Sequence, residues 1–189
     1  GLALEEPGDV VEVEYAETEG VQIVEVTGAP SLSTNPTRNA AGIAASAVLH
    51  RIGLAEPIGV RLWLRKGMPL ASGLGSSAAS SVAAAVAVNE LCSGGLSRQA
   101  LVECALEGEK AVSGTTHADN VAPSLLGGIV LIRSYAPLEL VSLPVPPALR
   151  VVVIYPHIQV QTAQARQRVA ERRFEIAQVV TNLGNVAAL

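Results

Sequence analysis

The sequence predicts an α+β fold, in which strands and helices come in pairs rather than in a steady β-α-β alternation. The 189 residues are 49% hydrophobic, which is enough to build one substantial core. Only 3% of the residues are aromatic, so that core must consist of Ala, Val, Leu and Ile. Small aliphatic side chains suit helices that pack closely on a sheet.

Two strands are expected near the start of the chain. Residues 10–15 and 21–26 are rich in β-branched and aromatic side chains, which favour strands. The sequence Thr18-Glu19-Gly20 between them resembles a hairpin turn. The two strands are therefore expected to form a hairpin.

A helix and a third strand are expected next. Asn35 is a good N-cap and Pro36 is tolerated at the first helical position, so a helix is expected from there. It should run through residues 37–52 and end near Gly53. Residues 59–67 alternate apolar and polar side chains, which is the pattern of a half-buried strand.

Two helices are then expected in succession. The first is rich in Ala and Val, spans residues 76–91 and is ended by the glycine pair at 94–95. Ser97 is a suitable N-cap for the second, which covers residues 98–112 and ends at Gly114.

The last third of the chain mixes loops, strands and helices. Residues 115–128 form either a polar loop or a short helix, and residues 129–132 read as a strand. Residues 144–150 contain three prolines and resemble a linker, and residues 151–156 open a new strand. Residues 162–189 have a helical pattern.

A domain boundary is expected near Pro146, which divides the chain into residues 1–146 and 147–189. The chain ends inside an apolar helical pattern that has no cap or stop signal. We therefore expect a truncated product or a segment of a longer protein.

Composition narrows the classes of function. The formal charge is −4 and there is no basic stripe, which argues against a nucleic-acid partner. No apolar run is as long as a membrane span and no signal peptide is visible, so a cytoplasmic protein is the default. A plastid form without its transit peptide is also compatible with the sequence. Cys92 and Cys104 lack the spacing of a zinc site and are interpreted as small buried side chains.

The stretch "PLASGLGSSAASS", residues 69–81, carries the strongest functional signal. A glycine-rich turn between a strand and a helix start forms an anion site, because the first helical N–H groups lack intrahelical acceptors. Glycines let the backbone wrap a phosphate, and serines add hydroxyl groups. The alternative is close helix packing through Gly and Ala.

Two familiar nucleotide motifs do not fit this stretch. "GLGSSA" matches Gly-x-Gly-x-x-Ala, but a second helix follows where the dinucleotide fingerprint needs a strand with an acidic residue. No Lys follows the glycines, so a Walker A loop is absent. A phosphate cradle of another kind remains.

Two motifs resemble the GHMP kinases, named for galactokinase, homoserine kinase, mevalonate kinase and phosphomevalonate kinase. The segment "PLASGLGSSAA", residues 69–79, resembles the phosphate loop of that family. The segment "HADNVAP", residues 117–123, is similar to the homoserine kinases in particular. The order and separation of the motifs also match, and the resemblance covers essentially the whole chain.

The resemblance implies a fold and an activity. The fold is the two-domain GHMP kinase fold, with an N-terminal ATP-binding domain of the ribosomal S5 domain 2 type over residues 1–146. Residues 147–189 would begin a ferredoxin-like C-terminal domain. The activity is transfer of the γ-phosphoryl group of ATP to the hydroxyl of L-homoserine, in threonine biosynthesis, with Mg²⁺ as the metal. Relatives have an N-terminal strand and loop before the first residue here and continue past residue 189, which implies a truncated form.

Partners follow from the same resemblance. ATP and L-homoserine are the implied ligands, no nucleic acid or membrane is implied, and a homodimer is left open. Another GHMP kinase, of the mevalonate type, or a non-catalytic nucleotide-binding module are the alternative functions.

The resemblance also implies roles for single residues. Asp119 and Asn120 would be catalytic, and Ser77 and Glu109 would hold Mg²⁺ on the nucleotide phosphates. ATP and its phosphates would be bound by Asn39, Pro69, Gly73, Leu74, Gly75, Ser76, Ser77, Ala78 and Thr162. The substrate would be bound by His117, Asp119, Asn120 and Arg166. Thr162 and Arg166 are four residues apart, so on a helix they would share a face.

Each of these residues also has a simple structural interpretation. Glu109 and Asn39 could be solvated helix residues, and His117 could be a loop residue. Asp119 could be an N-cap of a short helix, and Arg166 could lie on the surface. Only their joint occurrence in this order favours the functional interpretation.

Overall fold

The computed structural model describes residues 1–114, 116–154 and 171–187, and the chain divides into two compact units, residues 1–159 and 160–189. The boundary expected at residue 146 lies within the first unit and stays a prediction. Thr162 and Arg166 lie outside the described residues.

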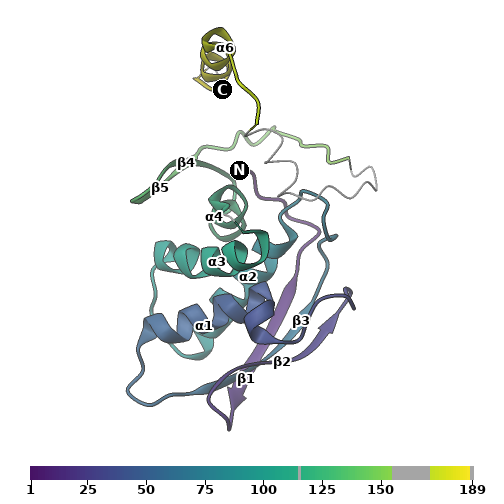
Figure 1. Ribbon diagram of the computed structural model, residues 1–189, viewed down its shortest axis with the longest axis vertical. Coiled ribbons are helices and arrows are strands. Elements are labelled where there is room, and N and C mark those ends of the chain that lie inside the picture. The colour runs from purple at the N-terminus through teal and green to yellow at the C-terminus, as the bar shows by residue number, and fades with distance from the viewer. Residues whose placement is uncertain (115, 155–170, 188–189) are drawn as a thin grey trace. The chain divides into compact units, whose positions relative to one another are not determined.

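The first unit is built on a three-stranded sheet (Figure 1). Its strands are β1 (Val10–Ala16), β2 (Gly20–Thr27) and β3 (Gly59–Arg65), in the order β1-β3-β2. β3 pairs antiparallel with β1 and parallel with β2. All three strands were expected from the sequence, but the hairpin between the first two is wrong.

The reason for this order is the apolar pattern of β3. Val60, Leu62 and Leu64 alternate along one face of β3 and are fully or almost fully buried. A strand with such a face is best placed at the centre of the sheet, where it has a neighbour on each side. The chain therefore leaves β2, crosses over through a helix and returns parallel to β2, as a parallel pair requires.

The crossover contains two helical segments instead of one. A short 3₁₀ helix, η1 (Pro36–Arg38), is followed by the α-helix α1 (Ala40–Ile52). Asn39 separates them because its backbone is extended, with φ −122° and ψ 130°. The helix expected to run without a break from Pro36 is therefore interrupted at Asn39, and it ends at Gly53 as expected.

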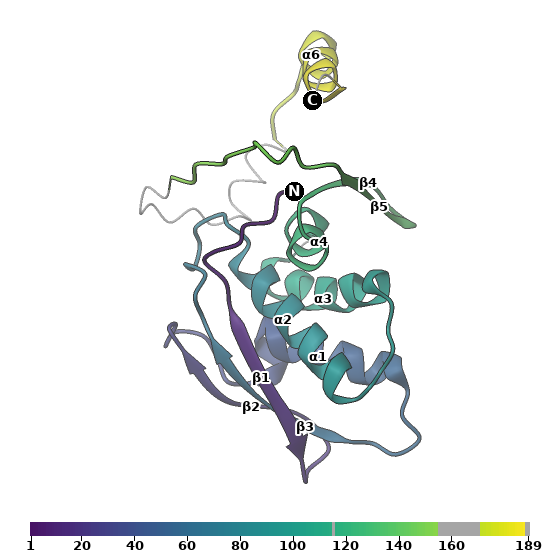
Figure 2. The ribbon, with the colours of Figure 1, turned by 180° about the vertical axis from the view of Figure 1, so that it is seen from behind.

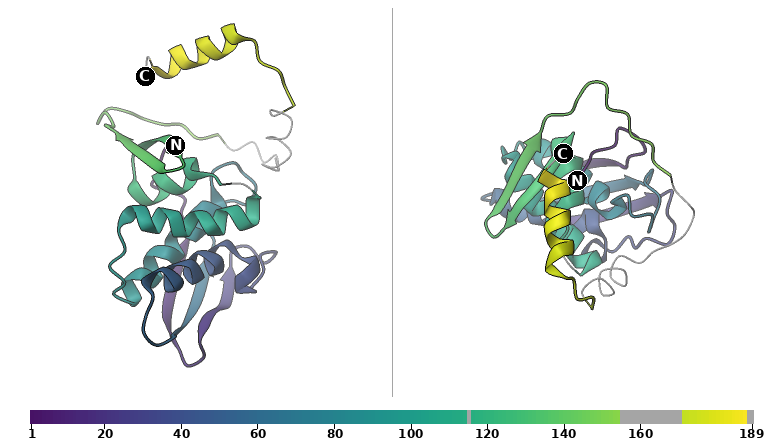
Figure 3. Two further views of the ribbon diagram at one scale, coloured as in Figure 1. Left: turned by 60° about the vertical axis from the view of Figure 1, so that its left-hand side comes forward. Right: turned by 90° about the horizontal axis from the view of Figure 1, so that it is seen from above.

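The two helices expected in succession are confirmed. They are α2 (Ser76–Leu91) and α3 (Arg98–Ser113). Ser97 caps α3, because its hydroxyl oxygen accepts a hydrogen bond from the N–H of Ala100 at 3.2 Å. α1, α2 and α3 lie on the same side of the sheet (Figures 1 and 3). α2 packs against α1, α3 and β1, so it is surrounded by other elements and small side chains are required along much of its length.

The remainder of the first unit is a short helix and a hairpin. Of the polar loop and the short helix that the sequence left open, the structure has the short helix, α4 (Ala118–Leu126), which leads into β4 (Ile129–Tyr135). β4 pairs antiparallel with β5 (Leu138–Leu143), a strand that the sequence pattern did not reveal. The N-terminal segment lies against the start of this hairpin, where the N–H of Ala3 donates to the carbonyl of Gly128 at 2.8 Å (Figure 2).

The structure describes only part of the strand and of the helical segment expected at the end of the chain. Residues 151–154 are not in a strand, and the rest of the strand expected at 151–156 lies outside the described residues. Of the helical pattern at 162–189, the second unit contains α6 (Ile176–Ala187). None of the described helices is long and apolar enough to span a bilayer.

The core of the first unit is made of small residues, as the composition predicts. Ala41, Ala44 and Ala45 of α1 and Ala84 and Ala85 of α2 are completely buried. The helices approach closely at Gly108 of α3, where an added Cβ would lie 2.4 Å from the carbonyl oxygen of Ala40. Close packing through glycine therefore occurs in this fold, for example at Gly108 in the second half of α3.

Candidate functional site

The glycine-rich loop joins β3 to α2 and is open rather than packed. Gly73 and Gly75 adopt left-handed φ values of 77° and 80°, which favour glycine. An added Cβ on Gly73 would meet nothing within 4 Å, and the atoms nearest to one on Gly75 would belong to the side chain of Asn120. Close packing therefore does not explain Gly73, whereas Gly75 also lies close to Asn120. The left-handed backbone is common to both glycines, and the space at Gly73 leaves the loop accessible to a ligand.

α2 begins at this loop with the features of an anion site. Gly75 is its N-cap, and no side chain among the described residues caps the helix there. The first turn contains no acidic residue, so nothing within it neutralises the partial positive charge of the helix start. Ser76 and Ala78 are buried, Leu74 and Ser77 are partly exposed, and the loop from Pro69 onward is partly or fully exposed. The loop that leads into the helix is therefore accessible, whereas Ser76 itself is buried.

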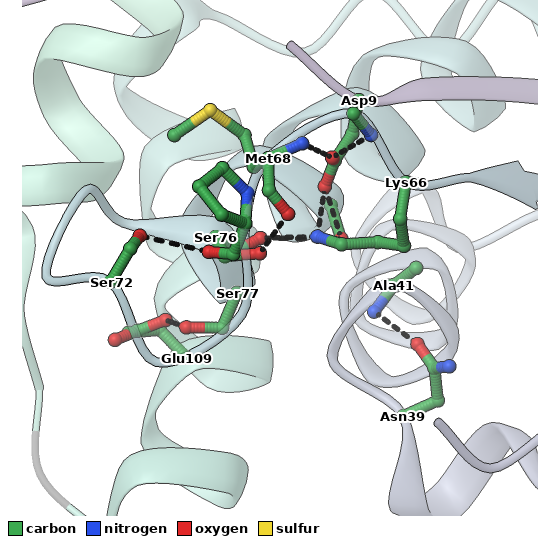
Figure 4. A network of polar contacts seen from close by, with 12 residues as sticks. Asp9, Asn39, Ala41, Lys66, Met68, Ser72, Ser76, Ser77 and Glu109 are labelled. Atoms are coloured by element: carbon green, nitrogen blue, oxygen red, sulfur yellow. Dashed lines mark hydrogen bonds and ion pairs between the residues drawn. The ribbon is translucent and has the colours of Figure 1, made fainter. Parts of the chain in front are cut away.

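Ser77, Glu109 and His117 form a connected polar cluster. The Ser77 hydroxyl donates to Oε2 of Glu109, and Oε1 of Glu109 lies 3.1 Å from Nδ1 of His117. Glu109 is 3% exposed and His117 is 1% exposed, so neither is a solvated helix or loop residue. Figure 4 shows the Glu109 carboxylate, which comes from α3, turned toward Ser77 at the start of α2. The two residues expected to hold a metal are therefore brought together.

The donors of this cluster fit Mg²⁺. Magnesium prefers hard oxygen ligands, and it is commonly held by one or two protein groups together with phosphate and water. Ser77 and Glu109 offer a hydroxyl and a carboxylate oxygen that already lie within hydrogen-bonding distance of each other. His117 bonds the other carboxylate oxygen, which fixes the orientation of Glu109.

Asn120 and Asp119 lie in the first turn of α4, opposite the glycine loop. His117 is the N-cap position of α4, so the N-cap interpretation of Asp119 does not hold. The position of a Cβ on Gly75 is 3.3 Å from Oδ1 of Asn120, which places this amide at the edge of the loop. Both residues are partly exposed. An open cavity of about 1960 Å³ is lined in this region by Asp9, Met68, Gly73, Leu74, Gly75 and Asn120.

Asn39 caps α1 and joins it to the preceding loop. Its Oδ1 accepts from the N–H of Ala41 at 3.0 Å, which caps α1, and its Nδ2 donates to the carbonyl of Ser33 at 2.8 Å. The residue is 5% exposed, so it is not the solvated helix residue of the simple interpretation. Contact with a nucleoside stays a prediction.

Sequence reasoning missed a buried ion pair below the glycine loop. Nζ of Lys66 donates to Oδ2 of Asp9, and the two side chains are 1% and 0% exposed. Burial lowers the pKa of the Lys66 ammonium, and the hydrogen bond and charge of Asp9 oppose this shift. The sequence feature that could have indicated this pair is a single Lys at the end of an apolar strand, directly before the loop. A Lys in such a position is ordinarily interpreted as a solvated side chain.

Comparison with known proteins gives consistent results. Residues 39–128 match the GHMP kinases N terminal domain. The whole chain aligns with the homoserine kinase of Chlorobium phaeobacteroides strain BS1 at 40% identity, and it spans 62% of the length of that relative.

Solved structures agree with this result. The crystal structure of homoserine kinase from Cytophaga hutchinsonii matches 98% of the chain with a TM-score of 0.91 and 41% identity, and 58% of that protein is covered. Mevalonate kinase of Methanococcus jannaschii matches 71% of the chain with a TM-score of 0.57, and 45% of that protein is covered. Its 15% identity supports the fold alone.

The predicted fold class is thereby confirmed, since the GHMP match spans α1 to α4 and includes the glycine loop, Glu109 and Asn120. Residues 39–128 thus match the N-terminal domain of the GHMP kinases, and the two relatives named above at 40% identity or more are homoserine kinases.

Proposed function

We propose that the chain belongs to an ATP-dependent homoserine kinase, which transfers the γ-phosphoryl group of ATP to the hydroxyl of L-homoserine. The observation that carries the proposal is the open glycine loop at the start of α2, with the Glu109 carboxylate bonded to Ser77 beside it. The identity to homoserine kinases gives the acceptor alcohol. Because the chain spans 62% of such a relative, the activity is proposed for the whole protein.

In this proposal, the backbone from Gly73 to Ser77 wraps the phosphates of ATP. Its N–H groups and the start of α2 bind the negative charge, and the open space at Gly73 gives the phosphates room to approach. Ser77 and Glu109 would hold Mg²⁺, which neutralises charge on the phosphates. Pro69, Leu74, Ser76 and Ala78 shape the same loop, and Asn39 and Thr162 complete the proposed nucleotide contacts.

The acceptor would bind on the α4 side of the loop. Asn120 would orient the attacking hydroxyl toward the phosphates, and its position next to Gly75 supports this role. Asp119, in the same turn, would either accept the hydroxyl proton or hold the amino group of the substrate. Arg166 would bind the carboxylate. His117 lies 3.1 Å from Glu109 and would hold it in place, and contact of His117 with the substrate stays a prediction. Phosphoryl transfer depends mainly on such positioning and on charge stabilisation.

An ADP-release assay on the whole protein tests the proposal. We expect release of ADP with L-homoserine and Mg-ATP, and none above background with mevalonate or galactose. Turnover with mevalonate in place of homoserine would favour the alternative GHMP kinase. Binding of Mg-ATP in titration calorimetry without turnover of any alcohol would favour a non-catalytic nucleotide-binding module.

A cytoplasmic location and a homodimer complete the proposal. The location rests on the sequence pattern, and the homodimer rests on the family resemblance. Light scattering of the purified whole protein tests the second, with a mass of one subunit as the contradicting result.

A further inference from the structure

We propose that Asp9 and Lys66 are a positioning pair, which fixes the base of the glycine loop and thereby sets the affinity for nucleotide without contacting it. The inference rests on the proposed function, because it assigns the loop to nucleotide phosphates. It adds two residues that lie outside the loop and outside the metal and substrate contacts proposed above.

Lys66 connects the end of β3 to the first turns of α2. Its Nζ donates to the carbonyl of Ser76 at 2.7 Å, to Oγ of Ser80 at 2.8 Å and to Oδ2 of Asp9. An ammonium group has three protons to donate, and all three find acceptors here. The first residue of α2 is therefore tied directly to the strand that precedes the loop.

Asp9 connects the same point to the turn that leaves β3. Its Oδ1 accepts from the N–H groups of Gly67 and Met68, both at 3.0 Å, and its Oδ2 accepts from Oγ of Ser80 at 2.6 Å. The acceptor sites of the carboxylate are thus occupied by four donors from two different sides of the loop.

The loop is closed at its base by these contacts. Met68 is the last residue before Pro69, and its carbonyl accepts from Oγ of Ser76 at 3.1 Å. Figure 4 shows Asp9, Lys66, Met68 and Ser76 gathered on one side of the loop, with Ser77 and Glu109 on the other. The tip at Gly73 has no neighbour within 4 Å of an added Cβ, so its position depends on the base.

The energetics of a buried ion pair favour a positioning role over a stabilising one. Removing two charges from water costs about as much as their attraction returns, so an apolar pair of similar volume is often as stable. Directional contacts to Ser76, Gly67 and Met68 are what an apolar pair could not provide. We therefore expect nucleotide affinity to be more sensitive to this pair than fold stability is.

The test compares a single and a double variant of the whole protein. Lys66→Met leaves the Asp9 carboxylate buried without its cation, so it should lower the thermal unfolding midpoint. D9N/K66M removes both charges, keeps an amide oxygen for the N–H groups of Gly67 and Met68, and should recover most of that loss. Ser80→Ala is a milder variant that keeps both charges and tests the same anchor if the double variant does not fold.

Two measurements separate the possible results. Titration calorimetry gives the Kd for Mg-ATP, and hydrogen exchange gives the protection of amides 67–80. We expect D9N/K66M to bind at least about tenfold more weakly and to exchange faster in this segment, although its stability has recovered. Ser80→Ala should bind Mg-ATP about threefold more weakly, and its amides 67–80 should also exchange faster.

The matched control is an exposed ion pair on β1 and β3, the two strands that Asp9 and Lys66 adjoin. Arg65 and Glu12 lie 3.4 Å apart with side chains 65% and 71% exposed, and E12Q/R65M should leave both measurements unchanged. Wild-type Kd and exchange in D9N/K66M and in Ser80→Ala would overturn the inference. A different result would be that the wild type binds no Mg-ATP, while D9N/K66M still exchanges faster than the wild type. That result would overturn the proposed function but support the role of Asp9 and Lys66 at the base of the loop.

Discussion

Burial of Lys66 and its pairing with Asp9 shift the pKa of the Lys66 ammonium group in opposite directions. Burial lowers its pKa, and this effect exceeds the hydrogen bond and charge of Asp9, which raise it. The pKa in the folded protein is therefore below that in the unfolded chain. Between these two values the unfolded chain binds more protons than the folded one, so the free energy of unfolding must rise with pH.

This gives a prediction for alkaline pH. Between the lowered pKa of Lys66 and its ordinary value of 10.5, the unfolding free energy of the wild type should increase with pH relative to that of D9N/K66M. Urea unfolding of both proteins at a series of pH values from 7 to 10.5 measures the difference. Lys66 and Asp9 are the two titrating groups in which the proteins differ, and an aspartate carboxyl ordinarily titrates far below this pH range, so a pH-dependent difference is assigned to Lys66. A constant difference over the whole range would contradict the prediction.

Glu109 allows the metal proposal to be tested at one residue. Glu109→Gln keeps the size of the side chain and an oxygen for the Ser77 hydroxyl, but it removes the negative charge proposed to hold Mg²⁺. We expect kcat/KM for Mg-ATP to fall on the order of 100-fold with little change in the unfolding midpoint. Steady-state assays over a range of Mg²⁺ concentrations provide the measurement.

The control lies two residues away on the same helix. Glu107 is exposed, so Glu107→Gln removes an equal charge from α3 without touching the cluster. If both variants lost the same activity, the effect would come from the net charge of the helix and not from the cluster.

The residues of the site differ in how far the sequence could predict them. Ser77 and Glu109 were expected to act together, and the structure joins them by a hydrogen bond. The contact between Glu109 and His117 depends on the bend between α3 and α4, which the sequence pattern does not contain. The pairing of Asp9 with Lys66 joins residues 57 positions apart in the sequence, and periodicity says nothing about such pairs.

At the scale of elements, the loop between β3 and α2 offers two glycines in similar conformations but different surroundings. Gly73 and Gly75 have φ values of 77° and 80°. A Cβ on Gly73 would be in open space, whereas on Gly75 it would lie 3.1 Å from Cβ of Asn120. The two sites therefore separate the cost of the left-handed backbone from the cost of crowding α4.

Alanine at each position should show this difference. Gly73→Ala is expected to lower the unfolding free energy by about 1 kcal/mol, through backbone strain alone. Gly75→Ala should cost more, because Asn120 at the end of the cavity must also move. Urea unfolding of both variants gives the comparison. Equal losses would show that α4 yields to the new methyl group without resistance.

The helices were easier to predict than the pairing of the strands. α2 and α3 have local signals at their ends, such as Ser97 before α3 and glycine after it. The bounds expected from the sequence therefore lie close to the observed ones. The hairpin expected between β1 and β2 failed because strand order is set by contacts with β3, more than 30 residues later. β5 was missed because its side chains are half exposed and the alternation of apolar residues is weak.

At the scale of the whole molecule, the core explains both the success and the limits of the sequence analysis. Composition predicted small aliphatic packing, and Ala residues of α1 and α2 are indeed completely buried. The GHMP fold itself came from the resemblance of two motifs, because composition alone fits many α+β arrangements. The structure adds β3 as the central strand, on which both the sheet and the glycine loop depend.

The central position of β3 leads to a prediction for global stability. Leu62 is completely buried in β3 and is among the largest such side chains in a core otherwise rich in Ala. Alanine side chains in the core have no rotatable bonds with which to fill a cavity, so Leu62→Ala should lower the unfolding free energy by about 3 kcal/mol or more. Val24 in β2 is 49% exposed, and Val24→Ala should cost less than about 0.5 kcal/mol. Urea unfolding, followed by far-UV circular dichroism, measures both. A loss for Leu62→Ala as small as that for Val24→Ala would mean that the core around β3 can repack, and that the strand is not the fixed support from which the glycine loop is held.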